Sequence, residues 1–145
     1  MEFQLRQANK DDWDFIWSLR VVTMKDMIAQ SYGWDENIQR SYAQESLTGK
    51  LILVYGVAVG VITLSDWGEQ LHLTWLAIVP QMQRQGLGSN LIQYCQQQAI
   101  KLGKPLTLQV LRNNPAVSLY RRFGFEISEQ NTSDKLLMQW NPKSS

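Results

Sequence analysis

The segment from residue 79 to residue 90 places an apolar, strand-like run directly before a glycine-spaced loop and an amphipathic helix. It reads Val79-Pro80-Gln81-Met82-Gln83-Arg84-Gln85-Gly86-Leu87-Gly88-Ser89-Asn90. The first turn of a helix has unpaired backbone N–H groups and a partial positive charge. Two glycines let a phosphate approach those groups, and Arg84 adds a permanent cation beside them. The segment therefore predicts a strand–loop–helix unit that cradles a pyrophosphate.

Two common phosphate-binding loops are excluded by their own spacing. A Walker A loop requires a lysine after its second glycine, and none follows here. The dinucleotide fingerprint requires a third glycine, where this chain has Leu91. An ordinary strand-to-helix turn is the remaining alternative. Pro80 and the Gln83-Arg84 pair, at fixed distances from the glycines, favour the phosphate loop over it.

The composition indicates one folded domain over residues 1–145, ending in a short polar tail at residues 142–145. Hydrophobic residues make up 44% of the 145 residues, and the net charge is +1 without any basic block. That balance argues against nucleic acid or an anionic membrane as a partner. No apolar run could span a bilayer, and the first residues lack a signal-peptide pattern. We therefore expect a cytoplasmic protein.

The chain has one cysteine and one histidine, too few soft ligands for a zinc site, so we expect no metal. Cys95 shares a helical spacing with four apolar residues, which predicts a buried core thiol rather than a nucleophile. These four are Leu87, Leu91, Ala99 and Leu102.

Hydrophobic periodicity and turn residues predict an alternation of strands and helices. Strands are expected at Glu2–Gln7, Leu51–Tyr55, Val57–Leu64, Gln70–Val79, Leu106–Leu111, Phe125–Ser128 and Lys135–Trp140. Helices are expected after a cap at Asn9, Asp11 or Asp12, from Asp35 to about Leu47, over Leu87–Leu102, and from Asn114 to Phe123. Hairpins outnumber crossover helices, so the fold class is α/β with a mixed, mostly antiparallel central sheet and about four flanking helices.

Two separate motifs resemble the GNAT superfamily of acyl-coenzyme A-dependent N-acetyltransferases. The first is the Gln/Arg-x-x-Gly-x-Gly loop within Leu73–Ile92, and the second is Leu119-Tyr120-x-x-x-Gly124-Phe125, preceded by Asn114-Pro115. With the element order included, the resemblance covers nearly the whole chain. A further segment, Tyr32-Gly33-Trp34-Asp35 followed by Gln39, is similar to small, mostly uncharacterised bacterial members.

The resemblance implies acetyl-coenzyme A (acetyl-CoA) as the acyl-donor cosubstrate. The backbone of Arg84, Gln85, Gly86, Leu87, Gly88 and Ser89 would hold its pyrophosphate. Backbone groups of Ala77 and Ile78 would pair with the peptide-like pantetheine arm, as a strand neighbour does. Asn114 matches an asparagine near the cofactor in relatives. It is equally expected to cap the following helix, and one residue can fill both roles.

Acyl transfer to an amine needs a base for the amine, a donor for the oxyanion and a proton for the departing thiolate. By family analogy, a backbone N–H near Ile78 is the oxyanion donor. Tyr120 matches the family tyrosine that protonates the thiolate. A packing tyrosine on an amphipathic helix is the alternative for Tyr120.

The general base is open. His72, the only histidine, has a suitable ordinary pKa of about 6.5 and precedes the loop on a strand. Glu69, Asp35 and Glu36 are alternatives, as is direct binding of neutral amine. Ribosomal-protein N-terminal acetyltransferases place a glutamate where this chain has Gln109, and an amide cannot take the proton. That departure argues against copying their mechanism and substrate.

Tyr32, Trp34 and Asp35 are expected to shape the acceptor pocket, with the aromatic rings contacting a cationic amine and Asp35 pairing with it. The sequence thus predicts an N-acetyltransferase acting on a primary amine of a small molecule or peptide. The alternative is a non-catalytic acyl-CoA sensor or regulatory protein. Homodimers occur among such domains, but the chain carries no mark that decides its oligomeric state.

Overall fold

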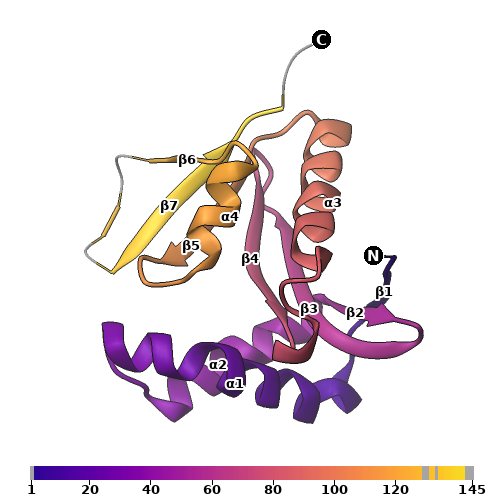
Figure 1. The fold of residues 1–145 in the computed structure, drawn as a ribbon, viewed down its shortest axis with the longest axis vertical. Coiled ribbons are helices and arrows are strands. Elements are labelled where there is room, and N and C mark those ends of the chain that lie inside the picture. The colour runs from indigo at the N-terminus through magenta and orange to yellow at the C-terminus, as the bar shows by residue number, and fades with distance from the viewer. Residues whose placement is uncertain (1, 129–130, 133, 143–145) are drawn as a thin grey trace. The chain divides into compact units, whose positions relative to one another are not determined.

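The computed structural model describes residues 2–128, 131–132 and 134–142 (Figure 1). The predicted tail falls partly outside this range, at residues 143–145. The strands are β1 (Gln4–Gln7), β2 (Lys50–Val54), β3 (Val57–Asp66), β4 (Leu71–Ile78), β5 (Leu106–Leu111), β6 (Glu126–Ile127) and β7 (Lys135–Trp140). The α-helices are α1 (Trp13–Ser31), α2 (Glu36–Glu45), α3 (Leu87–Leu102) and α4 (Ala116–Arg122). Short 3-10 helices are η1 (Lys10–Asp12), η2 (Ser46–Thr48) and η3 (Pro80–Met82).

The strands form a mixed sheet in the order β1-β2-β3-β4-β5-β7-β6. The β1–β2, β2–β3, β5–β7 and β6–β7 pairs are antiparallel, while β4 and β5 are parallel. The register of β2 against β3 shifts between Ile52 and Leu53, which marks a bulge. The predicted fold class, a mostly antiparallel α/β sheet with four helices, is therefore confirmed within the described residues.

The chain divides into two compact units, and strands β3 and β4 contribute to both. The first unit comprises Met1–Thr63 and Trp75–Gly88, and the second comprises Leu64–Thr74 and Ser89–Ser145. The sequence-based assignment of residues 1–145 to a single acyltransferase domain stays a prediction.

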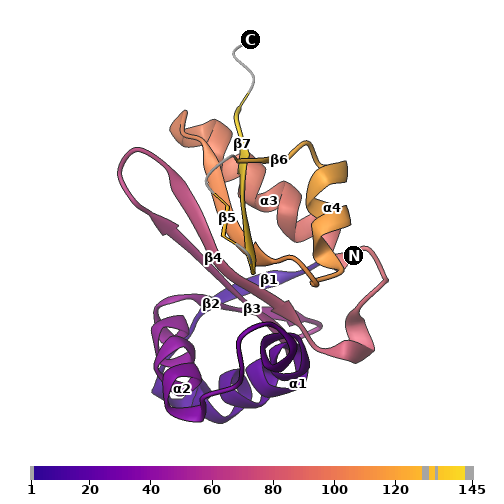
Figure 2. The ribbon, with the colours of Figure 1, turned by 90° about the vertical axis from the view of Figure 1, so that its left-hand side faces the viewer.

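In the first unit, α1 and α2 lie side by side (Figure 2), and the unit has its own apolar core. Its buried members are Ala8, Ile16, Leu19, Ala43, Leu51, Val61, Trp75 and Ala77. Burial of these side chains removes apolar surface from water, which is the main favourable term in folding. The predicted hairpin between β2 and β3 is confirmed, because Tyr55 and Gly56 both have positive φ, as a two-residue turn of this kind requires.

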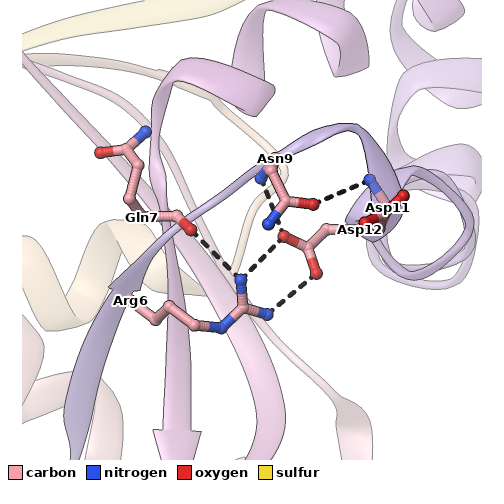
Figure 3. Close-up of polar contacts among 5 residues, drawn as sticks. All are labelled: Arg6, Gln7, Asn9, Asp11 and Asp12. Carbon is pink, nitrogen blue, oxygen red and sulfur yellow. Dashed lines mark hydrogen bonds and ion pairs between the residues drawn. The ribbon is translucent and has the colours of Figure 1, made fainter.

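The entrance to α1 is held by a polar cluster on the first unit (Figure 3). Asn9 forms a capping box: its Oδ1 accepts from Asp11 N at 2.9 Å, and its N donates to Asp12 Oδ2 at 2.9 Å. The Arg6 guanidinium donates to both carboxylate oxygens of Asp12, at 2.9 and 3.1 Å. These hydrogen bonds lower the pKa of Asp12 below its ordinary value. Of the three predicted capping candidates, Asn9 caps η1, the short helix that leads into α1, whereas Asp12 occupies the N-cap position of α1 without a side-chain cap hydrogen bond.

The second unit packs α3 and α4 with strands β5 and β7. Buried residues of this unit include Leu91, Ile92, Cys95, Ala99, Leu106, Leu108 and Met138. Gln96 Nε2 donates to Phe123 O at 2.8 Å and ties α3 to the end of α4. Cys95 is buried as predicted, and burial raises the pKa of its thiol to about 12. The expected burial of Leu102 is wrong: it is 49% exposed because α3 ends there.

Candidate functional site

The predicted phosphate loop has the conformation that its glycines allow. Gly86 has φ +88° and Arg84 has φ +63°, so both lie in the left-handed region. The loop residues from Gln83 to Gly86 are exposed, whereas Leu87, the first residue of α3, is buried and anchors the helix start. A Cβ on Gly86 would meet nothing within 4 Å, so the space over the loop is open. The first turn of α3 follows directly, and the first N–H groups of a helix have no carbonyl partner within the helix itself.

Two glutamine side chains hold the loop against the preceding residues. Gln83 Nε2 donates to Ile78 O at 2.8 Å, and Gln85 Nε2 donates to Gln81 O at 2.9 Å. The sequence had singled out Gln83 by its spacing alone, without this role. Because these bonds form within the chain, the loop is organised before any ligand binds, which lowers the entropy lost on binding.

The end of β4 presents its main-chain groups to alternate edges. Val79 N donates to Val59 O of β3 at 2.8 Å, and the carbonyl of Ala77 lies against Gly60 of β3. Since successive residues of a strand alternate in the edge they face, the main-chain N–H of Ile78 faces away from β3. The β4–β5 ladder comprises the pairs from Leu71↔Leu106 to Leu73↔Leu108, so Ile78 lies beyond it.

Asn114 occupies the start of α4 as predicted. Its Oδ1 accepts from Ala116 N at 2.9 Å, and its main-chain O accepts from Val117 N at 3.1 Å. Pro115 precedes the first residue of α4 with helical φ and ψ. The helix-capping role of Asn114 is therefore confirmed, and its role toward a cofactor stays a prediction.

Tyr120 lies buried in the second unit. Its ring packs edge to face against Phe125, with ring centroids 5.7 Å apart and an interplanar angle of 62°. Burial, with a smaller contribution from Cys95, raises the pKa of the Tyr120 phenol above its ordinary value of 10.0. The hydroxyl therefore keeps its proton at neutral pH and can act as a hydrogen-bond donor. The packing role and the donor role are compatible.

His72 lies on β4 in the second unit, opposite Thr107 of β5 in the parallel register. Its Nδ1 is 2.8 Å from Thr107 Oγ1, and its ring stacks on Trp67 with centroids 3.9 Å apart. Burial lowers the pKa of the imidazole below its ordinary value of 6.5, so His72 is neutral at pH 7. A base role would use Nε2, because Nδ1 is engaged by Thr107.

The alternative bases have partners or surroundings of their own. Glu36 pairs with Arg40 at 3.1 Å, one helical turn along α2. Asp35 Oδ1 accepts from Ile38 N at 3.1 Å and caps α2, as the sequence predicted. Glu69 is exposed in the turn between β3 and β4. Each of these three carboxylates is exposed to solvent.

The predicted acceptor segment follows the end of α1. Gly33, with φ +91°, terminates the helix, and Tyr32 is 46% exposed. Trp34 is half-buried: its ring centroid is 5.9 Å from that of Trp17, and Lys25 Nζ lies 5.7 Å from it. The aromatic ring therefore already faces a cation, the interaction predicted for it with a substrate.

A buried polar cluster of the first unit was not predicted. Arg20 of α1 is 7% exposed; its Nε and Nη2 donate to Gln39 Oε1 of α2 at 2.9 and 2.8 Å. The guanidinium carbon lies 5.4 Å from the Trp75 ring centroid and 5.5 Å from that of Tyr42. The sequence did carry a signal for this cluster: Arg20 lies four residues after Ile16, so the two residues share one face of the helix, and Ile16 is buried.

Among the described residues, no group of three histidine, cysteine, aspartate or glutamate side chains is arranged to hold a metal ion. In the same part of the chain, no helix has the length and apolar character needed to cross a membrane.

Comparisons with known proteins bear on this geometry. A family model described as an acetyltransferase (GNAT) domain matches residues 23–139. The cysteine-rich protein 2-binding proteins of mouse and human are 31% identical over 84 residues, which are 55% of this chain and 10% of theirs. The chain thus spans about a tenth of the length of these curated relatives.

Solved structures share the fold over nearly the full chain. The PaiA N-acetyltransferase of Thermoplasma acidophilum, crystallised with coenzyme A, has a TM-score of 0.76 at 17% identity, covering 97% of this chain and 99% of that one. Arabidopsis thaliana Naa50, in complex with a bisubstrate analogue, has a TM-score of 0.70 at 18% identity, covering 97% and 99%.

Proposed function

This chain belongs to the GNAT family of acetyltransferases, and from that premise we propose that it transfers the acetyl group of acetyl-CoA to a primary amine of a small molecule or peptide. The observation that carries the proposal is the phosphate loop, which Gln83 and Gln85 hold in place at the start of α3. The complexes of PaiA with coenzyme A and of Naa50 with a bisubstrate analogue support the same cosubstrate and an amine acceptor.

In this proposal the loop from Arg84 to Ser89 holds the pyrophosphate of acetyl-CoA. Gly86 leaves the space above the backbone open, Arg84 supplies charge, and the N–H groups of the first turn of α3 donate. Ile78 receives the pantetheine arm, because its main chain faces the edge that β3 does not use. Its carbonyl already accepts from Gln83, and an oxygen with two lone pairs can accept again. Asn114 completes the proposed cofactor contacts. The carbonyl of Ala77 lies against Gly60 of β3, so we do not expect Ala77 to pair with the pantetheine arm through that group.

The thioester of acetyl-CoA supplies the acetyl group. We assign the N–H of Ile78 to the carbonyl oxygen that gains negative charge when the amine attacks. Tyr120 then donates its proton toward the departing thiolate. Because the raised pKa of the phenol exceeds the thiol pKa of about 8.5, complete transfer is uphill, and Tyr120 assists mainly as a hydrogen-bond donor. Its contribution is therefore a modest one.

His72 is the proposed base through Nε2, since its neutral imidazole can accept a proton at pH 7. Tyr32, Trp34 and Asp35 are the proposed contacts of the amine. Only Oδ1 of Asp35 is used in capping α2, so the same carboxylate can serve the helix and contact a cation.

The test is a calorimetric titration with acetyl-CoA and with coenzyme A, comparing wild type with Gly86→Glu. The new carboxylate repels the pyrophosphate and fills the open space, so saturable binding is expected to disappear. Gly68→Glu is the matched control: Gly68 has φ +90° against +88° for Gly86, and a Cβ on either glycine meets nothing within 4 Å. Both variants carry the same strain, and only one alters the loop.

A folded wild-type protein that binds neither compound would refute the proposal. Saturable binding without thiol release across a panel of amines would instead support the non-catalytic sensor.

A further inference from the structure

The Arg20 cluster, formed by Arg20, Gln39 and Trp75, holds a buried positive charge that no carboxylate neutralises at ion-pair distance among the described residues. Burial lowers the pKa of Arg20, and Tyr32, Tyr42 and Glu45 partly offset that effect. A guanidinium remains charged in proteins, so the cation persists despite its burial. An uncompensated buried charge is costly, which distinguishes Arg20 from an ordinary surface arginine.

The same cluster has more donors than acceptors. Gln39 is fully buried, and its Oε1 accepts both bonds from Arg20. Gln39 Nε2 and Trp75 Nε1 are buried and have no hydrogen-bond partner within the part of the chain that the structure describes. Such groups are rare in folded proteins, and each represents a site where an acceptor is missing. Since Oε1 and Nε2 belong to one amide, the unused donor lies beside the guanidinium that the amide binds.

We propose that the Arg20 cluster binds the carboxylate of the acceptor, so that the preferred substrates are amines that also carry a carboxylate; this inference rests on the proposed acetyltransferase function. A carboxylate brings two acceptor oxygens and one negative charge, which complement the two unpartnered donor nitrogens, Gln39 Nε2 and Trp75 Nε1, and the buried cation. A water molecule could satisfy the donors but would leave the charge unpaired.

The position of the cluster agrees with this role. Arg20 and Gln39 belong to the helices that flank the predicted acceptor segment, Tyr32–Asp35, in the sequence. Tyr42, whose ring contacts the Arg20 guanidinium, is 44% exposed, so the cluster borders solvent at this residue. In this proposal the amine enters beside Tyr42, and its carboxylate reaches Arg20, which is itself 7% exposed.

Matched ligand pairs that differ only in the charge test the proposal. Binding of N-acetylglycine and N-acetylglycinamide is measured by calorimetry with and without coenzyme A, and acetylation of glycine, glycinamide and 2-aminoethylphosphonate is followed by thiol release. Hydrogen bonds to a charged group are worth about 1.5–3 kcal/mol, so wild type is expected to favour the acid roughly 10- to 100-fold.

Three variants separate recognition from folding. Gln39→Glu places a carboxylate against Arg20, so it is expected to remain folded and to lose the preference for the acid. Trp75→Phe removes one N–H and keeps an aromatic ring, so the preference is expected to fall several-fold. Arg40→Met, which removes an exposed arginine that stacks on Trp17 of α1, is the control and is expected to keep the preference.

Equal affinity and turnover for acid and amide in wild type would overturn the proposal. So would a preference that survives in folded Gln39→Glu. Faster turnover of 2-aminoethylphosphonate than of glycine would overturn the carboxylate assignment, because the cluster would then prefer a phosphate-like group. A protein that binds no coenzyme A but distinguishes N-acetylglycine from its amide would refute the proposed function while retaining the anion site.

Discussion

Gly60 of β3 offers a sensitive test of how β4 is positioned. A Cβ built on Gly60 would lie 2.4 Å from the carbonyl oxygen of Ala77 and 3.3 Å from the Cα of Ile78. Ordinary van der Waals contact begins at 3.4 Å, so the nearer atom must move by about 1 Å. The obstructing atoms are largely backbone, so Gly60→Ala must push the end of β4 away from β3. The strain therefore falls on the strand segment assigned to the pantetheine arm.

The magnitude follows from this displacement. Overpacking costs about 1–3 kcal/mol, which lowers the Tm of a domain of this size by roughly 3–10 °C. Misplacement of a reacting group by about 1 Å can cost on the order of 100-fold in rate. We expect Gly60→Ala to remain folded and to lose between about tenfold and 100-fold in kcat/KM for acetyl-CoA.

Gly56→Ala is the control for Gly60→Ala. Gly56 lies in the β2–β3 turn with φ +76°, and a Cβ there meets nothing within 4 Å. Its cost is backbone strain of about 1–2 kcal/mol, comparable with the cost at Gly60, without displacing β4. Calorimetric Tm values and initial rates with acetyl-CoA are measured for both variants. A Gly60→Ala protein with wild-type kcat/KM, or with an unchanged Tm, would refute the reasoning.

Three further outcomes are expected. Tyr120→Phe should lower kcat about tenfold while leaving acetyl-CoA affinity unchanged, and an unaltered kcat when chemistry limits the rate would remove Tyr120 from the mechanism. The pKa of His72 is lowered in the folded protein, so the unfolded chain binds more protons below about pH 6.5, and the free energy of unfolding falls as the pH drops through that range. Denaturant titrations at pH 7.5 and 5.5 should therefore show a smaller loss of unfolding free energy for His72→Gln than for wild type. Equal losses in the two proteins would contradict this. Cys95, with its thiol pKa raised to about 12, should react with a thiol reagent only after denaturation, and rapid labelling of the native protein would show that it is accessible.

Much of the fold was predictable because its signals are local. The predicted bounds of α3 and β5 agree with the structure, since a 3.6-residue period and a short, largely apolar run lie between clear breakers at Gly86, Gly103 and Pro105. The N-caps Asp35 and Asn114 were also predictable, because each bonds to an amide within three residues. The first strand is shorter than predicted: β1 begins at Gln4 rather than Glu2, and its pairing with β2 begins there.

The phosphate loop was predictable for the same reason, since glycine spacing and helix start lie within ten residues. The hydrogen bonds that restrain the loop were not predictable. The bonds from Gln83 to Ile78 and from Gln85 to Gln81 depend on side-chain directions that the η3 turn determines. Arg20 shows the limit of sequence-based prediction more clearly. In the sequence it only interrupts an apolar row, and its role can be inferred only when its partners on α2 and β4 are known.

The sequence alone predicted the order of the main strands and helices, the caps at Asp35 and Asn114 and the glycine loop, and it indicated the family, because each depends on residues that are close along the chain. The tertiary structure decided which polar groups lose contact with water. Arg20 meets Gln39 across 19 positions, and His72 meets Thr107 across 35. Desolvation depends on every neighbour in space, so the lowered pKa of His72 and the unpaired donors beside Arg20 arise only when distant segments pack together.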